Sequence, residues 1–147
     1  MNKVFDNKLY LSDTIKPQTM YNYLIYFRPQ TTLTITELKE GLSEYLNEQQ
    51  PSEIKISDDC VIVTFGAYQF RLFVSSDSHV NEELREMIDD GMSDLDDNPI
   101  DSNLYGASTL RVEMGGDVDM DMDHFNDCIF ILEYFESRGD NVIINEG

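Results

Sequence analysis

The sequence predicts a single α+β domain over residues 1–147, in which a mixed or antiparallel sheet carries about three helices. In short stretches apolar residues alternate with polar ones, which is typical of strands. In longer stretches apolar residues recur every three or four positions, which indicates amphipathic helices. The two kinds of stretch follow one another along the chain, and one pair of strands is joined by a tight turn. We therefore expect a layered sheet with its helices on one face.

The first third of the chain carries clear local signals. An irregular N-terminal segment, 1–19, precedes a strand over 20–27, which is rich in aromatic and β-branched residues. Thr34 and Glu37 have the spacing of a capping box. A helix is therefore expected to start there and to end by Pro51.

A hairpin is the clearest element in the sequence. Before it, Ile54 and Ile56 alternate with polar residues in a short strand. Strands over 60–65 and 68–74 are then joined at Gly66, a residue suited to a tight turn. Tyrosine, phenylalanine and leucine share one face of the second of these strands.

The second half of the chain places helices and strands around an acidic connector. A helix is expected between a cap at Ser78 and Gly91, and the connector covers 90–108. A strand over 110–114 is expected to close at the glycine pair that follows it.

The last helix is expected to begin at an Asp123 cap and to end at Gly139. An apolar stripe that includes Cys128 and Phe135 supports it. A final strand over 142–144 completes the order.

The charge of the chain is large and unevenly distributed. The net charge is −19, whereas a magnitude of about 2–8 is enough to keep a small domain in solution. Residues 1–75 hold 7 Lys/Arg against 9 Asp/Glu, but residues 76–147 hold 3 against 20. Adaptation to high salt would spread acids over the whole chain, and a solubilising tail would lie at one end without apolar residues. The acidity is therefore a local feature that needs a local reason.

The first acidic segment alternates aspartates with apolar residues. Its acids are Asp117, Asp119, Asp121 and Asp123. The spacing resembles the opening of an EF-hand calcium loop, but Met122 stands where that loop needs glycine and Cys128 where it needs glutamate. Metal binding is therefore not the expected function of this segment.

An extended backbone would turn this segment into a ladder of carboxylates about 7 Å apart. Val118, Met120 and Met122 would then face the core. In that conformation the first three aspartates are candidate partner-binding residues: Asp117, Asp119 and Asp121. The alternative is a solvated acidic loop that contributes only the Asp123 cap.

The second acidic segment covers 92–105, where acids surround isolated apolar residues. Its candidate partner-binding residues are Asp94, Asp96, Asp97, Asp101 and Tyr105. Charge of this kind steers an encounter, while a few apolar and aromatic side chains supply binding energy. The alternative is a flexible loop whose apolar side chains turn back onto the core.

The sequence gives little support for an enzymatic function. No nucleophile elbow, phosphate-binding loop, dinucleotide-binding glycine pattern or zinc-protease motif is present. Cys60 and Cys128 lie in apolar stretches, which indicates buried structural thiols, and His79 and His124 lie near expected helix starts. We therefore expect neither catalysis nor a cofactor.

Direct binding of nucleic acid or membrane is also not expected. Phosphate contacts need Lys and Arg, and 7 of the 10 lie in the nearly neutral half. The sequence lacks a secretory signal at its N-terminus and an apolar run long enough to span a membrane. With two cysteines and no disulfide framework, a cytoplasmic location is expected.

The charge pattern favours an acidic protein that binds and neutralises a basic protein. In kind, though without a shared motif, the chain is similar to immunity proteins, which guard a cell against a nuclease or another cationic toxin. The alternative is a nucleic-acid mimic of the anti-restriction or anti-CRISPR type, which blocks a DNA-binding or RNA-binding enzyme. A mimic should bind several basic proteins, whereas an immunity protein should bind one.

Overall fold

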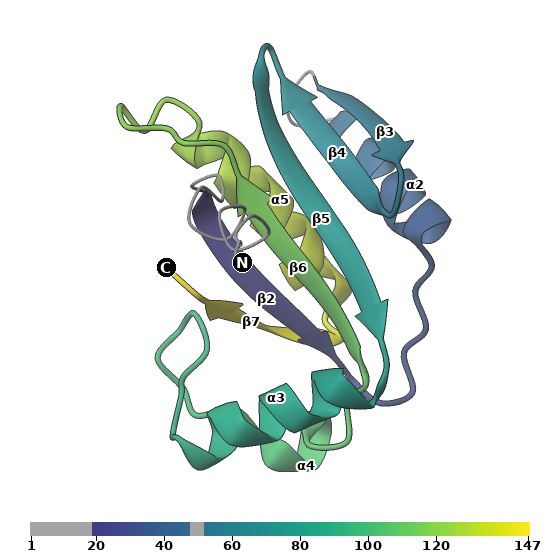
Figure 1. The fold of residues 1–147 in the computed structure, drawn as a ribbon, viewed down its shortest axis with the longest axis vertical. Helices are drawn as coiled ribbons and strands as arrows, with labels where there is room; N and C mark the ends of the chain where they lie inside the picture. Colours follow the sequence, from purple (N-terminus) through teal and green to yellow (C-terminus); the bar gives the residue numbers. More distant parts are fainter. Residues whose placement is uncertain (1–18, 48–51) are drawn as a thin grey trace, which may run out of the picture.

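The computed structural model describes residues 19–47 and 52–147 and confirms the α+β prediction. Six antiparallel strands form one open sheet in the order β3-β4-β5-β6-β2-β7 (Figure 1). The strands are β2 (Met20–Phe27), β3 (Glu53–Ser57), β4 (Cys60–Phe65), β5 (Tyr68–Ser76), β6 (Leu110–Gly116) and β7 (Asn141–Asn145). The helices are α2 (Ile35–Asn47), α3 (Ser78–Asp89), α4 (Ser102–Tyr105) and α5 (Phe125–Arg138).

The main core lies between the sheet and the two helices α2 and α5, which Figure 1 shows behind the strands. Alternate residues of β2, among them Ile25 and Phe27, point into this core together with Phe70 and Leu72 of β5. Phe135 of α5 meets Phe27 edge to face, with ring centroids 6.3 Å apart. This layer buries the apolar stripes that predicted the helices.

A second, smaller core lies on the opposite face of the sheet. Val80 and Leu84 of α3 pack there against Leu24 and Tyr26 of β2 and Ile144 of β7. The expectation that the helices share one face is therefore wrong for α3. A short helix with a narrow apolar stripe fits either face of a half-covered sheet, so local periodicity does not choose between them.

Several local predictions are confirmed at atomic detail. The Thr34 amide donates to the Glu37 carboxylate (2.9 Å), and the Glu37 amide donates to the Thr34 hydroxyl (3.1 Å). The hairpin turns at Gly66 with φ of 66°, and α5 ends at Gly139 with φ of 74°. Both glycines occupy the left-handed region that they enter without a steric penalty.

Two boundary predictions, at the start of α3 and the end of β6, are wrong. Asp77 rather than Ser78 caps α3, because its side chain accepts from the amides of His79 and Val80. The glycine pair that was expected to close β6 belongs to the strand, where it pairs with both β2 and β5. The predictions for 1–18 and for the helix end near Pro51 lie outside the described residues.

Among the helices of residues 19–47 and 52–147, none is long and apolar enough to cross a bilayer.

Candidate partner-binding surfaces

The acidic segment 92–105 covers the outer edge of β7. The Leu95 amide donates to the Ile143 carbonyl (3.1 Å), and the Tyr105 hydroxyl donates to the Asn141 carbonyl (3.1 Å). A bridge between Ser93 and Pro99 closes the segment on itself. These bonds occupy carbonyls that an edge strand would otherwise expose to another chain.

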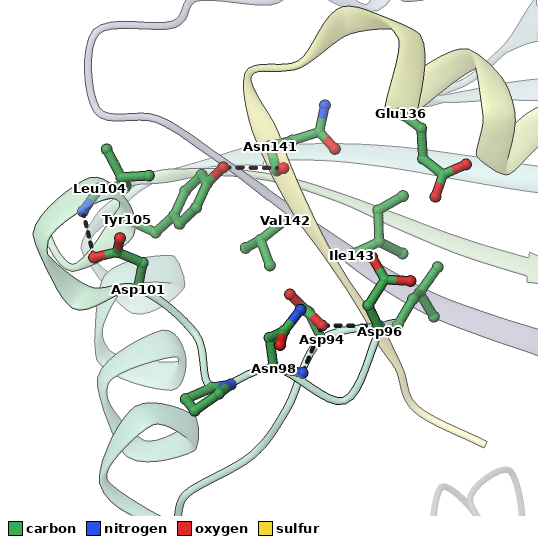
Figure 2. Close-up of a pocket in the computed structure, with 12 residues that line it drawn as sticks. Asp94, Asp96, Asn98, Asp101, Leu104, Tyr105, Glu136, Asn141, Val142 and Ile143 are labelled. Carbon is green, nitrogen blue, oxygen red and sulfur yellow. Dashed lines mark hydrogen bonds between the residues drawn. The ribbon is translucent and has the colours of Figure 1, made fainter.

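A surface cavity of about 410 Å³ lies between this segment and β7 (Figure 2). Four acidic residues line it: Asp94, Asp96, Asp101 and Glu136. Among the described residues that line it there is no lysine or arginine, and Val142 and Ile143 add apolar surface. We call this cavity the acidic pocket.

Local hydrogen bonds fix two of the four carboxylates. Asp94 accepts at Oδ1 from the amides of Asp96 (2.8 Å) and Asn98 (3.0 Å). Asp101 caps α4 by accepting, also at Oδ1, from the amide of Asn103 (2.9 Å) and that of the next residue. Within the described ranges neither Oδ2 atom has a donor, so each carboxylate keeps one oxygen for a cation.

The apolar residues of this segment divide into two groups. Ile100 and Tyr105 are buried in the second core, as the alternative interpretation of this loop expected. Met92 and Leu104 stay 37% and 40% exposed. Tyr105 therefore anchors the segment, and Leu104 is the apolar side chain that it leaves accessible beside the pocket.

Asp97 lies outside the pocket, at the exposed tip of the turn. Its φ of 63° is a left-handed conformation, which aspartate tolerates better than most residues. Of the candidates in this segment, Asp97 is thus the one that the structure separates from the other acids.

The segment 117–124 is a compact turn, and the predicted extended ladder is wrong. Asp119 is buried, and Asp117 forms an ion pair with Arg71 at 3.0 Å. Asp121 and Asp123 remain exposed. The acids of this segment therefore do not line up as one row of free carboxylates.

Asp119 instead holds the start of α5. Its carboxylate accepts from the amides of Asp123 (3.1 Å) and His124 (2.8 Å), and from the Tyr21 hydroxyl (2.7 Å). Both amides precede Phe125, the first residue of α5, so Asp119 fixes the turn that leads into the helix. The predicted Asp123 cap is wrong, because His124 occupies the N-cap position, where no side chain makes a capping hydrogen bond.

The same bonds decide the charge state of Asp119. Burial alone raises the pKa of its carboxyl, but hydrogen bonds from the His124 amide, the Tyr21 hydroxyl and the Asp123 amide outweigh burial. The net result is a pKa below the ordinary value of 3.8. Asp119 is thus a structural anion in the folded chain.

His124 is engaged on both sides. Its Nδ1 lies 2.9 Å from the Asp127 carboxylate, and its ring stacks on Tyr68 with centroids 4.2 Å apart. Both cysteines are buried, and burial raises the pKa of the Cys128 thiol to about 12. A thiol in that state is a poor nucleophile.

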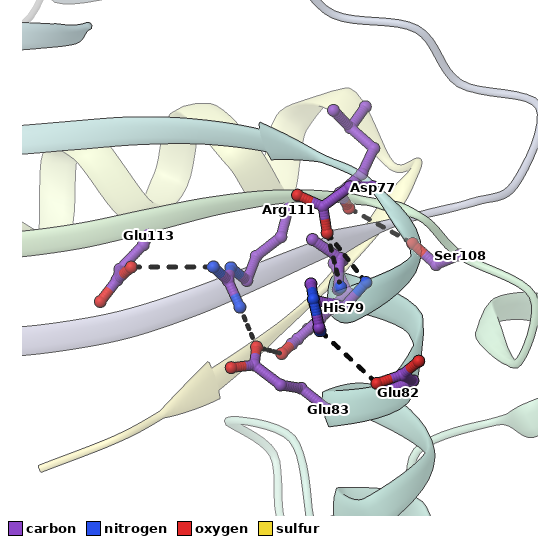
Figure 3. Close-up of polar contacts among 10 residues, drawn as sticks. Asp77, His79, Glu82, Glu83, Ser108, Arg111 and Glu113 are labelled. Atoms are coloured by element: carbon purple, nitrogen blue, oxygen red, sulfur yellow. Dashed lines mark hydrogen bonds and ion pairs between the residues drawn. The ribbon is translucent and has the colours of Figure 1, made fainter.

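A further acidic surface lies on α3, where Arg111 of β6 offsets part of the charge (Figure 3). Arg111 forms an ion pair with Glu83 and lies 3.9 Å from Glu113. His79 lies 3.5 Å from Glu82 near the start of the helix. Glu86, Asp89 and Asp90 are exposed farther along the helix and its end.

The two predicted binding segments do not form one surface. In Figure 1 the turn 117–124 projects at the upper end of the sheet, beside the start of α5. The segment 92–101 lies toward the lower end, beside α3 and β7. Within the described ranges, no group of three or more His, Cys, Asp or Glu side chains is arranged to hold a metal.

Glu136 and Asn141 are among the residues of the acidic pocket that the sequence interpretation missed. Glu136 comes from the last turn of α5, and Asn141 from the start of β7. The Gly139 turn, which the sequence did indicate, returns the chain beside the helix and so brings both to the cavity. Their place opposite Asp94 depends on which strand forms the edge of the sheet.

Comparison with known protein families, with curated proteins and with solved structures returned no match for this chain.

Proposed function

We propose that this chain is an acidic binding protein that neutralises a basic protein partner. The observation that carries the proposal is the acidic pocket, with four acidic residues and an apolar wall. Carboxylates held close together without a cation repel one another, and a positively charged side chain relieves that repulsion. A lysine or arginine also buries its aliphatic stem against an apolar wall, as Val142 and Ile143 offer here.

The net charge of −19 supports fast association with such a partner. Long-range attraction raises the on-rate for an oppositely charged protein, and salt weakens it. An immunity-type inhibitor of a nuclease or another cationic toxin fits this chemistry best, because its target presents a cationic cleft. We place the chain in the cytoplasm, where such an inhibitor protects its own cell.

Binding rather than catalysis is proposed for three reasons. Both thiols are buried and have raised pKa values. His124 is held between Asp127 and Tyr68. The acidic pocket contains carboxylates without a histidine, cysteine, serine or lysine among the described residues that line it.

A nucleic-acid mimic is the second candidate, and α3 favours it. Glu82 and Glu86 are exposed one helical turn, about 6 Å, apart, and further acids continue toward the segment 92–101. A row of charges at such intervals imitates the phosphates of a nucleic-acid strand. Against it, Arg111 neutralises Glu83 within this row.

The test is affinity capture from the lysate of the source cell, with wild type and two charge variants side by side. Asp94→Asn/Asp96→Asn/Asp101→Asn removes three charges from the pocket, while asparagine keeps the capping acceptors. Glu53→Gln/Asp58→Asn/Asp59→Asn removes three exposed charges from β3 and its turn, at the other edge of the sheet. The washes use about 0.15 M and then about 0.5 M salt, which shortens the Debye length from about 8 Å to about 4–5 Å.

One basic protein that survives the second wash on wild type and on the β3 variant, but not on the pocket variant, is the expected result. A spread of nucleic-acid-binding proteins that all leave at the second wash would favour the mimic. Equal retention by all three forms would remove the acidic pocket from the interface.

A further inference from the structure

The turn 117–124 exposes apolar side chains where the sequence predicted acids. Together with the first residue of α5 they form what we call the apolar tip: Val118, Met120, Met122 and Phe125. Met120 is 82% exposed and Met122 52% exposed. Single exposed apolar residues are ordinary, but four exposed within eight positions of one turn are unusual.

Hydrogen bonds hold the base of the turn. Asp119 is buried beneath it and accepts three hydrogen bonds. Asp117 is tied to Arg71 and to the Gln69 amide (3.1 Å), both on β5. The turn is therefore held in one conformation before any partner arrives, which reduces the entropy lost on binding.

Two residues beside the turn adopt left-handed backbone conformations that bulky side chains rarely enter. Tyr21 has φ of 59° at a bulge in β2, and this conformation places its hydroxyl on Asp119. Met122 has φ of 57°. Each such conformation costs about 1–2 kcal/mol relative to a right-handed one. Strain of this kind concentrates at functional sites, and one of the two strained residues here, Met122, is 52% exposed.

Exposed acids flank the apolar side chains within the turn itself. Asp121 and Asp123 alternate with the exposed methionines, and residues 112–137 contain no lysine or arginine. A complementary surface is therefore apolar at its centre and cationic at its rim. Methionine suits such a contact because its flexible, polarisable side chain adapts to irregular apolar surfaces.

We infer that the apolar tip docks a basic amphipathic segment of the partner, with lysines or arginines flanking an apolar face. The inference rests on the proposed function, because that function supplies the basic partner. It adds a second contact point at the end of the sheet opposite the acidic pocket. The tip then adds apolar contacts, which salt does not screen, to the contacts that the acidic pocket makes.

The test uses the full chain and a synthetic helical peptide of about 20 residues, with leucines on one face and lysines on the other. One tryptophan stands among the leucines. Because the chain has no tryptophan, the fluorescence comes from the peptide. Wild type is expected to bind with a blue shift that persists at about 0.5 M salt.

Two variants assign the site. Met120→Ser/Met122→Ser is expected to weaken binding about tenfold, because the two apolar contacts are lost. The control Ile56→Ser/Met92→Ser changes two side chains that are 39% and 37% exposed elsewhere, and is expected to bind like wild type. Bound peptide should also slow the oxidation of Met120 and Met122 by peroxide, while that of Met92 is unchanged.

Equal affinity of wild type and the Met120/Met122 variant would overturn the inference, as would loss of all binding at high salt. A dimer of the free chain that only this variant dissociates would assign the tip to a second copy instead. If only the Asp94/Asp96/Asp101→Asn variant binds the peptide more weakly than wild type, the inference is overturned but the proposed function stays intact. If no form binds the peptide, the inference falls, and the capture experiment decides the proposed function separately.

Discussion

The segments 92–101 and 117–124 have similar compositions, with four aspartates spaced by apolar residues in each. They nevertheless differ in which side chains, acidic or apolar, they bury. In the first, Ile100 is buried and the carboxylates surround a cavity. In the second, the carboxylate of Asp119 is buried and the methionines point outward.

The difference lies in the donors that each segment meets. In the segment 117–124 the amides of Asp123 and His124, just before α5, need an acceptor, and Tyr21 adds a hydroxyl. A buried carboxylate with three donors is stable as an anion, so the turn closes around Asp119. The segment 92–101 meets the apolar second core instead, and Ile100 fills it. Alternation of acidic and apolar residues therefore does not indicate which set faces the protein.

The largest effect is expected from the buried carboxylate. Asp119→Asn replaces one acceptor oxygen with a donor and should lower the free energy of unfolding by about 2–3 kcal/mol. Asp121→Asn, in the same turn but exposed, should change it by less than about 0.5 kcal/mol. Urea unfolding monitored by circular dichroism measures both. Similar losses of unfolding free energy for the two variants would contradict the role of the buried Asp119 carboxylate as the group around which this turn closes.

Acid titration sharpens the same contrast. The pKa of Asp119 is lower in the folded chain than its ordinary value of 3.8. Its stabilisation is therefore complete above that value and disappears as the pH falls through the lower folded pKa. The difference in unfolding free energy between wild type and Asp119→Asn should shrink over that range, while the relief of general repulsion affects both proteins alike. A difference that stays constant below pH 4 would contradict an ionised, hydrogen-bonded Asp119.

A smaller effect is expected where a carboxylate of the acidic pocket also caps a helix. Asp101→Ala should cost about 1 kcal/mol, whereas Asp101→Asn should cost little because asparagine caps equally well. Amide exchange at Asn103 and Leu104 should accelerate in the alanine variant. Unchanged exchange would show that the α4 cap does not fix this side of the acidic pocket.

The smallest effect concerns the two left-handed residues, one in each turn. Met122→Gly should raise the free energy of unfolding by about 0.5–1 kcal/mol. Glycine relieves a strain of about 1–2 kcal/mol, and the larger conformational entropy that glycine loses on folding offsets part of this gain. Asp97→Gly should change it by less than about 0.5 kcal/mol, because aspartate already tolerates this conformation. The denaturation midpoints of the two variants measure this difference. A larger gain in stability from Asp97→Gly than from Met122→Gly would place the greater backbone strain at Asp97.

Much of the fold was predictable because its signals are local. The capping box at Thr34, the turn at Gly66 and the end of α5 at Gly139 each depend on residues a few positions apart. The predicted strands and helices followed from apolar periodicity in the same way. The clustering of acidic residues in the second half of the chain and the burial of both cysteines could also be predicted from the sequence.

The candidate site was predicted only in part. Asp94, Asp96 and Asp101 do line one cavity, but Glu136 joins them from a helix that the sequence interpretation did not connect to them. The placement of α3 on the opposite face likewise followed from the packing of the whole sheet.

Composition and short-range pattern thus specify which residues form strands, helices and caps, and where the charge is concentrated along the chain. Contacts between distant residues determine which way each acidic segment faces. Tyr21 reaches Asp119 across 98 positions, and Arg71 reaches Asp117 across 46. The orientation of a polar side chain depends on the donors that surround it in space, and short-range pattern does not specify which distant donors those are.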